Sequence, residues 1–142
     1  AYTFQDELNN VAITAPKRVT VYRNVAPEAL ARLLAASDWA VTSASSVAYE
    51  AATVGVGLAV AQYIPNQEKL YRFLTENELA IGLNDLQGDD LNVLTETLRS
   101  ADPRPWVARQ RRVFSPSAPA LRRLFEKLAL EQGVTLRAAQ PD

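Results

Sequence analysis

The chain contains no cysteine and no histidine among its 142 residues. The absence of cysteine excludes disulfide bonds, cysteine-based zinc sites and thiol nucleophiles. The absence of histidine removes the side chain that most often serves as a general base, a metal ligand or a pH switch. Catalysis by this chain alone would therefore rest on Asp, Glu, Lys or Tyr, and we expect neither a bound metal nor a cofactor.

A strong net charge and a long apolar run are also missing. The chain has 15 Lys and Arg residues and 16 Asp and Glu residues, for a net charge of −1. No global electrostatic field therefore favours binding to nucleic acid or to an anionic membrane. The densest basic run, Arg109-Gln110-Arg111-Arg112, is typical of a solvated helix face. No apolar run could span a bilayer and no signal-peptide pattern opens the chain, so we expect a cytoplasmic protein.

The remaining composition is that of a folded domain, with 48% hydrophobic and 22% charged residues. The length predicts one compact domain over residues 1–133, followed by a frayed tail over residues 134–142. The chain begins with Ala1, and its first residues resemble the middle of a domain. We therefore expect a fragment of a longer enzyme, or a split half that needs a partner subunit.

Short apolar segments alternate with amphipathic ones along the chain. This alternation predicts an α/β fold with a Rossmann-like parallel sheet and helices on both faces. The predicted strands cover residues 18–23, 39–42, 58–61 and 79–81. The predicted helices cover residues 3–13, 27–37, 46–54, 66–77, 89–100, 105–113 and 117–133, with Asn66 as the N-cap of the fourth and Gly55 in the left-handed position after the third.

Two crowded polar loops interrupt the stretch SASSVAYEAATVGVGLAVAQYIPNQE, residues 43–68. Ser43, Ala44, Ser45 and Ser46 follow the strand at 39–42, and Tyr63, Asn66 and Gln67 follow the strand at 58–61. The turn at Asn24 and Val25 follows the strand at 18–23. Ligands of open α/β sheets bind outside the carboxyl ends of the strands. We therefore expect the three loops to converge on one site.

The residue types of these loops suit a nucleotide. The small residues Ser43 to Ser46 lead into a helix whose first N–H groups and dipole attract an anion, most naturally phosphate. Glu50, one turn along, is placed to accept hydrogen bonds from a diol such as ribose. The amides of Asn66 and Gln67 suit sugar hydroxyls or an N-acetyl group.

Each of these residues also has a purely structural interpretation. Serines before a helix usually act as caps, and Ser46 and Glu50 lie near capping-box spacing. Asn66 is an adequate cap without any ligand, and Tyr63 can serve in packing. The hypothesis of a binding site depends on the convergence of all three loops.

The same residues resemble a known family. Ser43-Ala44-Ser45-Ser46-Val47-x-x-Glu50-Ala51, then Gly55, then Asn66-Gln67-Glu68, is similar to the C-terminal domain of the UDP-sugar hydrolase of pseudaminic acid biosynthesis (PseG type). That hydrolase is related to the MurG-like glycosyltransferases of the GT-B fold, which have two Rossmann domains. The resemblance covers residues 18–82 and fades toward residue 130.

The resemblance implies a UDP-sugar site in which Asn24 and Val25 read the uracil, Ser43–Ser46 hold the diphosphate and Glu50 holds the ribose. Tyr63, Asn66 and Gln67 would face the sugar. The implied reaction is hydrolysis that releases UDP and an amino-deoxy sugar, used for surface polysaccharide or flagellin glycosylation. The family places its catalytic histidine in an N-terminal domain that this chain lacks. We therefore assign no catalytic residue here and expect no turnover by this chain alone.

Two other functions remain open from the sequence. A glycosyltransferase of the same fold would transfer the sugar to an acceptor instead of water. A non-catalytic α/β interaction domain would use its apolar sheet edge to dock on a partner.

Overall fold

The structure is a computed structural model that describes residues 20–88, 90–114, 123, 126–128 and 130. The chain divides into two compact units, Ala1–Leu30 and Ala31–Asp142. In the first unit, residues 20–26 are irregular and lead into α2 (Pro27–Ala35), the helix that crosses the boundary between the units. Pro27 occupies the first helical position, where its missing N–H costs no hydrogen bond. The predicted helix at 3–13 lies outside the described residues.

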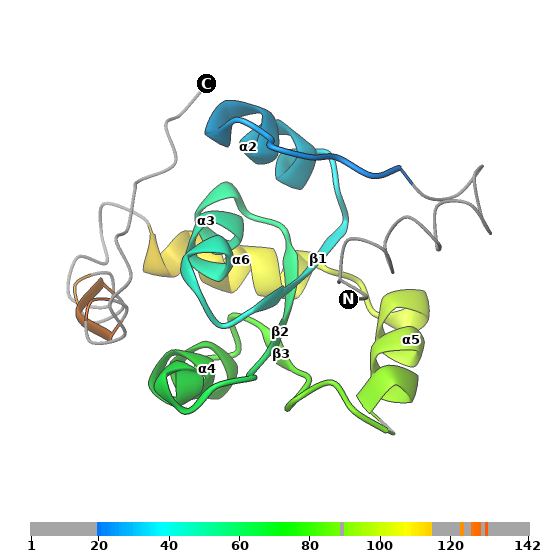
Figure 1. The fold of residues 1–142 in the computed structure, drawn as a ribbon, viewed down its shortest axis with the longest axis vertical. Coiled ribbons are helices and arrows are strands. Elements are labelled where there is room, and N and C mark those ends of the chain that lie inside the picture. The colour runs from blue at the N-terminus through cyan, green and yellow to red at the C-terminus, as the bar shows by residue number, and fades with distance from the viewer. Residues whose placement is uncertain (1–19, 89, 115–122, 124–125, 129, 131–142) are drawn as a thin grey trace, which may run out of the picture. The chain divides into compact units, whose positions relative to one another are not determined.

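The second unit is a mixed α/β fold built on a small parallel sheet (Figure 1). The sheet has three strands in the order β1-β2-β3, which confirms the parallel sheet expected from the sequence. The elements in chain order are β1 (Trp39–Ser43), α3 (Ser46–Val54), β2 (Gly57–Ala61), the 3₁₀ turn η1 (Pro65–Gln67), α4 (Glu68–Glu76), β3 (Ile81–Gly82), α5 (Asp90–Ser100) and α6 (Arg104–Val113).

The core is centred on β2, whose five residues are all buried. Successive side chains of a strand point to opposite faces, so full burial means that both faces of β2 are covered. α3 packs on β1 and β2 through small residues, and Ala48, Ala51 and Ala52 are almost completely inaccessible to solvent. Such short side chains let the helix backbone lie close to the sheet. Figure 1 shows α3 returning beside the two strands that it connects.

The connection from α3 to β2 depends on two glycines. Gly55 ends α3 in the predicted left-handed conformation, with φ of 87°, and its N–H donates to the carbonyl of Ala51. Gly57 begins β2 in a crowded position. A β-carbon there would lie 2.7 Å from the carbonyl oxygen of Asp38 and 2.8 Å from the Trp39 ring.

α6 fastens the starts of β2 and β3 to each other. The buried side-chain amide of Gln110 donates to the carbonyl of Val56 and to that of Leu79, both at 3.0 Å. Arg109 donates to the carbonyl of Glu78 at 2.7 Å, and its guanidinium lies 5.2 Å from the centre of the Trp106 ring. Trp106 meets Trp39 edge to face. One helix therefore satisfies backbone carbonyls just before two neighbouring strands.

Two predictions about local structure are wrong. Residues 20–23 form no strand, because a β-branched alternating sequence becomes a strand only where another strand pairs with it, and no described segment does. Asn66 is not a helix N-cap, because Pro65 starts a 3₁₀ turn and α4 begins only at Glu68. The predicted helix at 117–133 lies largely outside the described residues, of which 123, 126–128 and 130 are helical.

None of the helices in the described part of the chain is long and apolar enough to cross a membrane.

The crowding at Gly57 gives a test of the packing. Gly57→Ala forces its β-carbon against backbone and ring atoms, so we expect a loss of about 1–3 kcal/mol in the free energy of unfolding, measured by urea denaturation. Gly88→Asn is the matched control, since Gly88 has open space around it and asparagine tolerates its φ of 55°. A Gly57→Ala protein as stable as the parent would contradict this packing.

Candidate functional site

Three loops meet where the carboxyl ends of the strands lie, here called the carboxyl edge. Loop 1 is residues 43–46 after β1, loop 2 is residues 62–67 after β2, and loop 3 is residues 83–88 after β3. Backbone hydrogen bonds link loop 1 to the end of β2 and loop 2 to loop 3. The N–H of Ala44 donates to the carbonyl of Ala61 at 2.9 Å, and the N–H of Gln62 donates to the carbonyl of Asn84 at 2.6 Å.

Loop 1 leaves the start of α3 uncapped by a side chain. Ser45 occupies the N-cap position, but its hydroxyl makes no cap hydrogen bond. Instead, it accepts from the Ser43 hydroxyl at 3.0 Å. The Ser45 carbonyl accepts from the N–H groups of Ala48 and Tyr49. Among the described residues, the N–H groups of Ser46 and Val47 have no acceptor, so two donors remain at the positive end of the helix.

Glu50 lies one turn into α3 and is half-buried. Its carboxylate forms no hydrogen bond or ion pair with any described residue. The capping box that Ser46 and Glu50 could have formed is absent, because the N-cap is Ser45 and Glu50 lies beyond the third helical position, which Ala48 occupies. A carboxylate with no partner among the described residues therefore follows two amide donors along the same helix.

Loop 2 holds the other predicted sugar contacts. Gln67 uses its side-chain oxygen to accept from the N–H of Tyr63 at 2.9 Å, which fixes the turn and leaves only its NH₂ group for a ligand. The side chains of Tyr63 and Asn66 are exposed, and Tyr63 retains 58% of its accessible surface. The amide of Asn66 has no partner among the described residues. Loop 2 therefore offers an aromatic ring and two amide groups.

Loop 3 was not predicted from the sequence. The Tyr71 hydroxyl on α4 accepts from the backbone N–H of Asn84 at 3.0 Å, and Asn84 and Leu86 have φ values of 52° and 59°. A left-handed leucine is strained and persists only where its surroundings impose it. Leu86 packs against the buried cluster of Ala59, Ala61 and Leu83. The sequence signal was Asn84-Asp85 after an apolar segment, a common turn composition.

Asn24 and Val25 belong to the first unit, so they are described apart from the three loops. Asn24 is exposed and has a left-handed φ of 49°, which agrees with the predicted turn. The structure thus brings together the loops of Ser43–Ser46 and of Tyr63–Gln67, while the third loop at the carboxyl edge is residues 83–88. No group of acidic residues in the described part of the chain could hold a metal ion.

No protein-family model, no curated protein sequence and no solved structure matches this chain.

The bond between Tyr71 and loop 3 can be tested with a pair of Tyr→Phe variants. Tyr71→Phe removes the acceptor of the Asn84 N–H, so we expect a loss of about 1 kcal/mol in stability and faster hydrogen exchange at Asn84. Tyr63→Phe is the control, because the exposed Tyr63 hydroxyl bonds to no described residue, and we expect a change below about 0.5 kcal/mol. Unchanged exchange at Asn84 in Tyr71→Phe would refute the role of this bond.

Proposed function

We propose that this chain is the nucleotide-binding domain of a UDP-sugar enzyme with a Rossmann-like, GT-B type architecture. The observation that carries the proposal is the start of α3, where the N–H groups of Ser46 and Val47 have no partner among the described residues. They lie in the same helix as Glu50, whose carboxylate pairs with no residue in the described ranges. An anion binds such amides, and a vicinal diol suits the carboxylate.

Solvent exposure and position support loop 2 as the sugar side of this site. Loop 2 begins directly after Ala61, whose carbonyl accepts from the N–H of Ala44 in loop 1, so we expect a sugar attached to a diphosphate at α3 to extend toward Asn66 and Gln67. The exposed ring of Tyr63 offers an apolar surface to a deoxy-sugar.

The reaction we propose is that of a PseG-type hydrolase, in which water cleaves the sugar from UDP. The chain has no histidine, so we infer that the catalytic base comes from another domain or a partner subunit. A GT-B glycosyltransferase would need an acceptor instead. Release of free sugar by the assembled enzyme without an acceptor distinguishes the hydrolase from the transferase.

The site is tested by calorimetric titration of the chain with UDP. We expect Glu50→Gln to weaken binding about tenfold, since hydrogen bonds from ribose hydroxyls to a charged carboxylate are lost, while the free energy of unfolding is unchanged within about 0.5 kcal/mol. Glu96→Gln, at an exposed position of α5, is the matched control and should bind UDP as the parent does.

Two results would contradict the proposal. The first is a folded chain that does not bind UDP at millimolar concentration, which would favour the interaction domain. The second is equal UDP affinity in the parent, Glu50→Gln and Glu96→Gln proteins, which would remove Glu50 from the site.

A further inference from the structure

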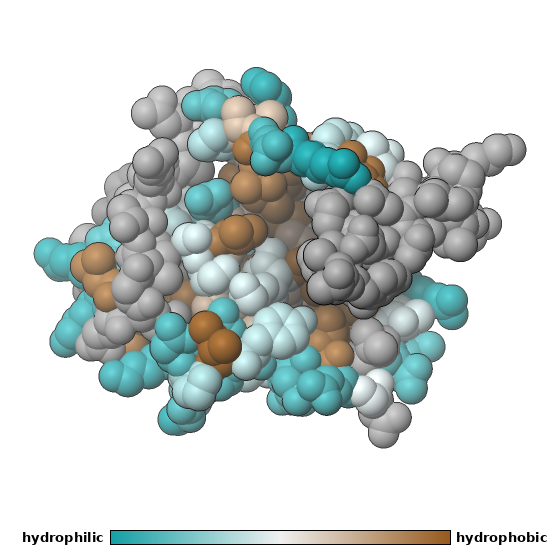
Figure 2. All heavy atoms as spheres, in the orientation of Figure 1, coloured by the Kyte–Doolittle hydropathy of each residue, from teal (hydrophilic) through white to brown (hydrophobic). Residues whose placement is uncertain are grey.

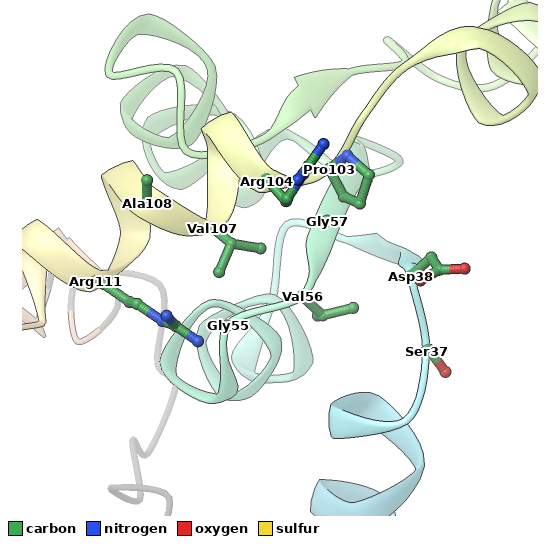
Figure 3. A pocket seen from close by; sticks show the side chains of 10 residues that line it. All are labelled: Ser37, Asp38, Gly55, Val56, Gly57, Pro103, Arg104, Val107, Ala108 and Arg111. Carbon is green, nitrogen blue, oxygen red and sulfur yellow. The ribbon is translucent and has the colours of Figure 1, made fainter.

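A concave surface lies at the opposite edge of the sheet, where the strands begin. This hollow has a volume of about 340 Å³ and is lined by the residues just before β1, the end of α3, the start of β2 and α6 from its first residue to Arg111 in its last turn (Figure 3). Ligand pockets range from about 300 to 1,000 Å³, so the hollow suits a small molecule. It lies wholly within the second unit and contains none of the predicted nucleotide-binding residues.

The walls of the hollow are mostly apolar. They are formed by Val56, Pro103, Val107 and Ala108, together with the backbone of Gly55 and Gly57. Figure 3 shows the Val107 side chain pointing into the hollow and the Asp38 carboxylate pointing away from it. The Ser37 hydroxyl donates a hydrogen bond to the Leu33 carbonyl at 2.7 Å. The lining therefore offers apolar contact and no acceptor side chain that faces inward.

Arg111 supplies the charge of this site. Its Nε lies 3.7 Å from where a Gly55 β-carbon would be, and no described residue forms an ion pair or hydrogen bond with its guanidinium. The partial negative charge at the nearby C-terminus of α3 offsets only about half of the unit positive charge of Arg111. Arg104 adds little positive charge to the hollow, because it forms an ion pair with Asp102 at 2.8 Å. The side-chain hydrogen bond from Arg104 holds the pKa of the Asp102 carboxyl below its ordinary value.

We propose that the hollow binds a small organic carboxylate, with its apolar body against Val56 and Val107 and its carboxylate on Arg111. A guanidinium without a partner can pair bidentately with a carboxylate, and apolar walls exclude the fully hydrated phosphate dianion. Because the site is at the opposite edge of the sheet from α3's first residues, it is independent of the proposed nucleotide site.

The chain carries its own reporter for this site. Its two tryptophans are Trp39 and Trp106, whose ring centres are 5.6 Å apart. Trp39 contacts Gly57, and Trp106 lies in α6 between lining residues. A ligand in the hollow would therefore change tryptophan fluorescence.

The test is a fluorescence titration with hexanoate, using hexanol and inorganic phosphate as comparison probes. We expect a saturable change with hexanoate alone, weakened about tenfold by Arg111→Gln. Arg112→Gln, the adjacent exposed arginine, should bind as the parent does. UDP at saturation should leave the hexanoate affinity unchanged.

Three results would overturn the proposal: a linear, non-saturable response to hexanoate, equal responses to hexanoate and hexanol, or equal weakening by Arg111→Gln and Arg112→Gln. Urea denaturation of each variant shows that a lost response is not due to unfolding. Competition between UDP and hexanoate would also contradict the assignment to two separate sites.

Discussion

The parallel pairing of β1 with β2 is the constraint on which the rest of the second unit depends. Its register runs from Trp39 opposite Gly57 to Ser43 opposite Ala61. A slip of one residue would turn every buried side chain of β2 to the other face. The register is fixed at its start by crowding around Gly57 and at its end by the hydrogen bond from Ala44 to Ala61. It thereby fixes where α3 begins and ends.

The direction of the strands gives the two edges of the sheet different chemistry. At the carboxyl edge, α3 presents amide donors and a Glu50 carboxylate that have no partner among the described residues. At the amino edge, Gln110 donates to the carbonyls before β2 and β3, and Arg111 forms no ion pair in the part of the chain that the structure describes. Figure 2 shows hydrophobic residues near the middle of one face and hydrophilic residues along its margin.

The sequence predicted the elements whose signals are local. Gly55, the apolar strand around Leu58 and the alternation of strands with helices were sufficient for the α/β fold and for the position of loops 1 and 2. It failed where tertiary partners decide: residues 20–23 have strand composition, but no strand in the described part of the chain pairs with them. Loop 3 and the two hydrogen bonds of the Gln110 side chain were missed because they join residues far apart in the sequence. No local pattern marks an amide that reaches carbonyls 31 and 54 residues away.

The proposed binding of a diphosphate by the first amides of α3 can be tested by a nuclear magnetic resonance titration of the ¹⁵N-labelled chain with UDP. We expect the amide signals of Ser46 and Val47 to shift most and to saturate together, while the amide of Val93 in α5 stays fixed. Saturable shifts confined to residues 103–111, or no shift in any amide of a folded chain, would contradict it.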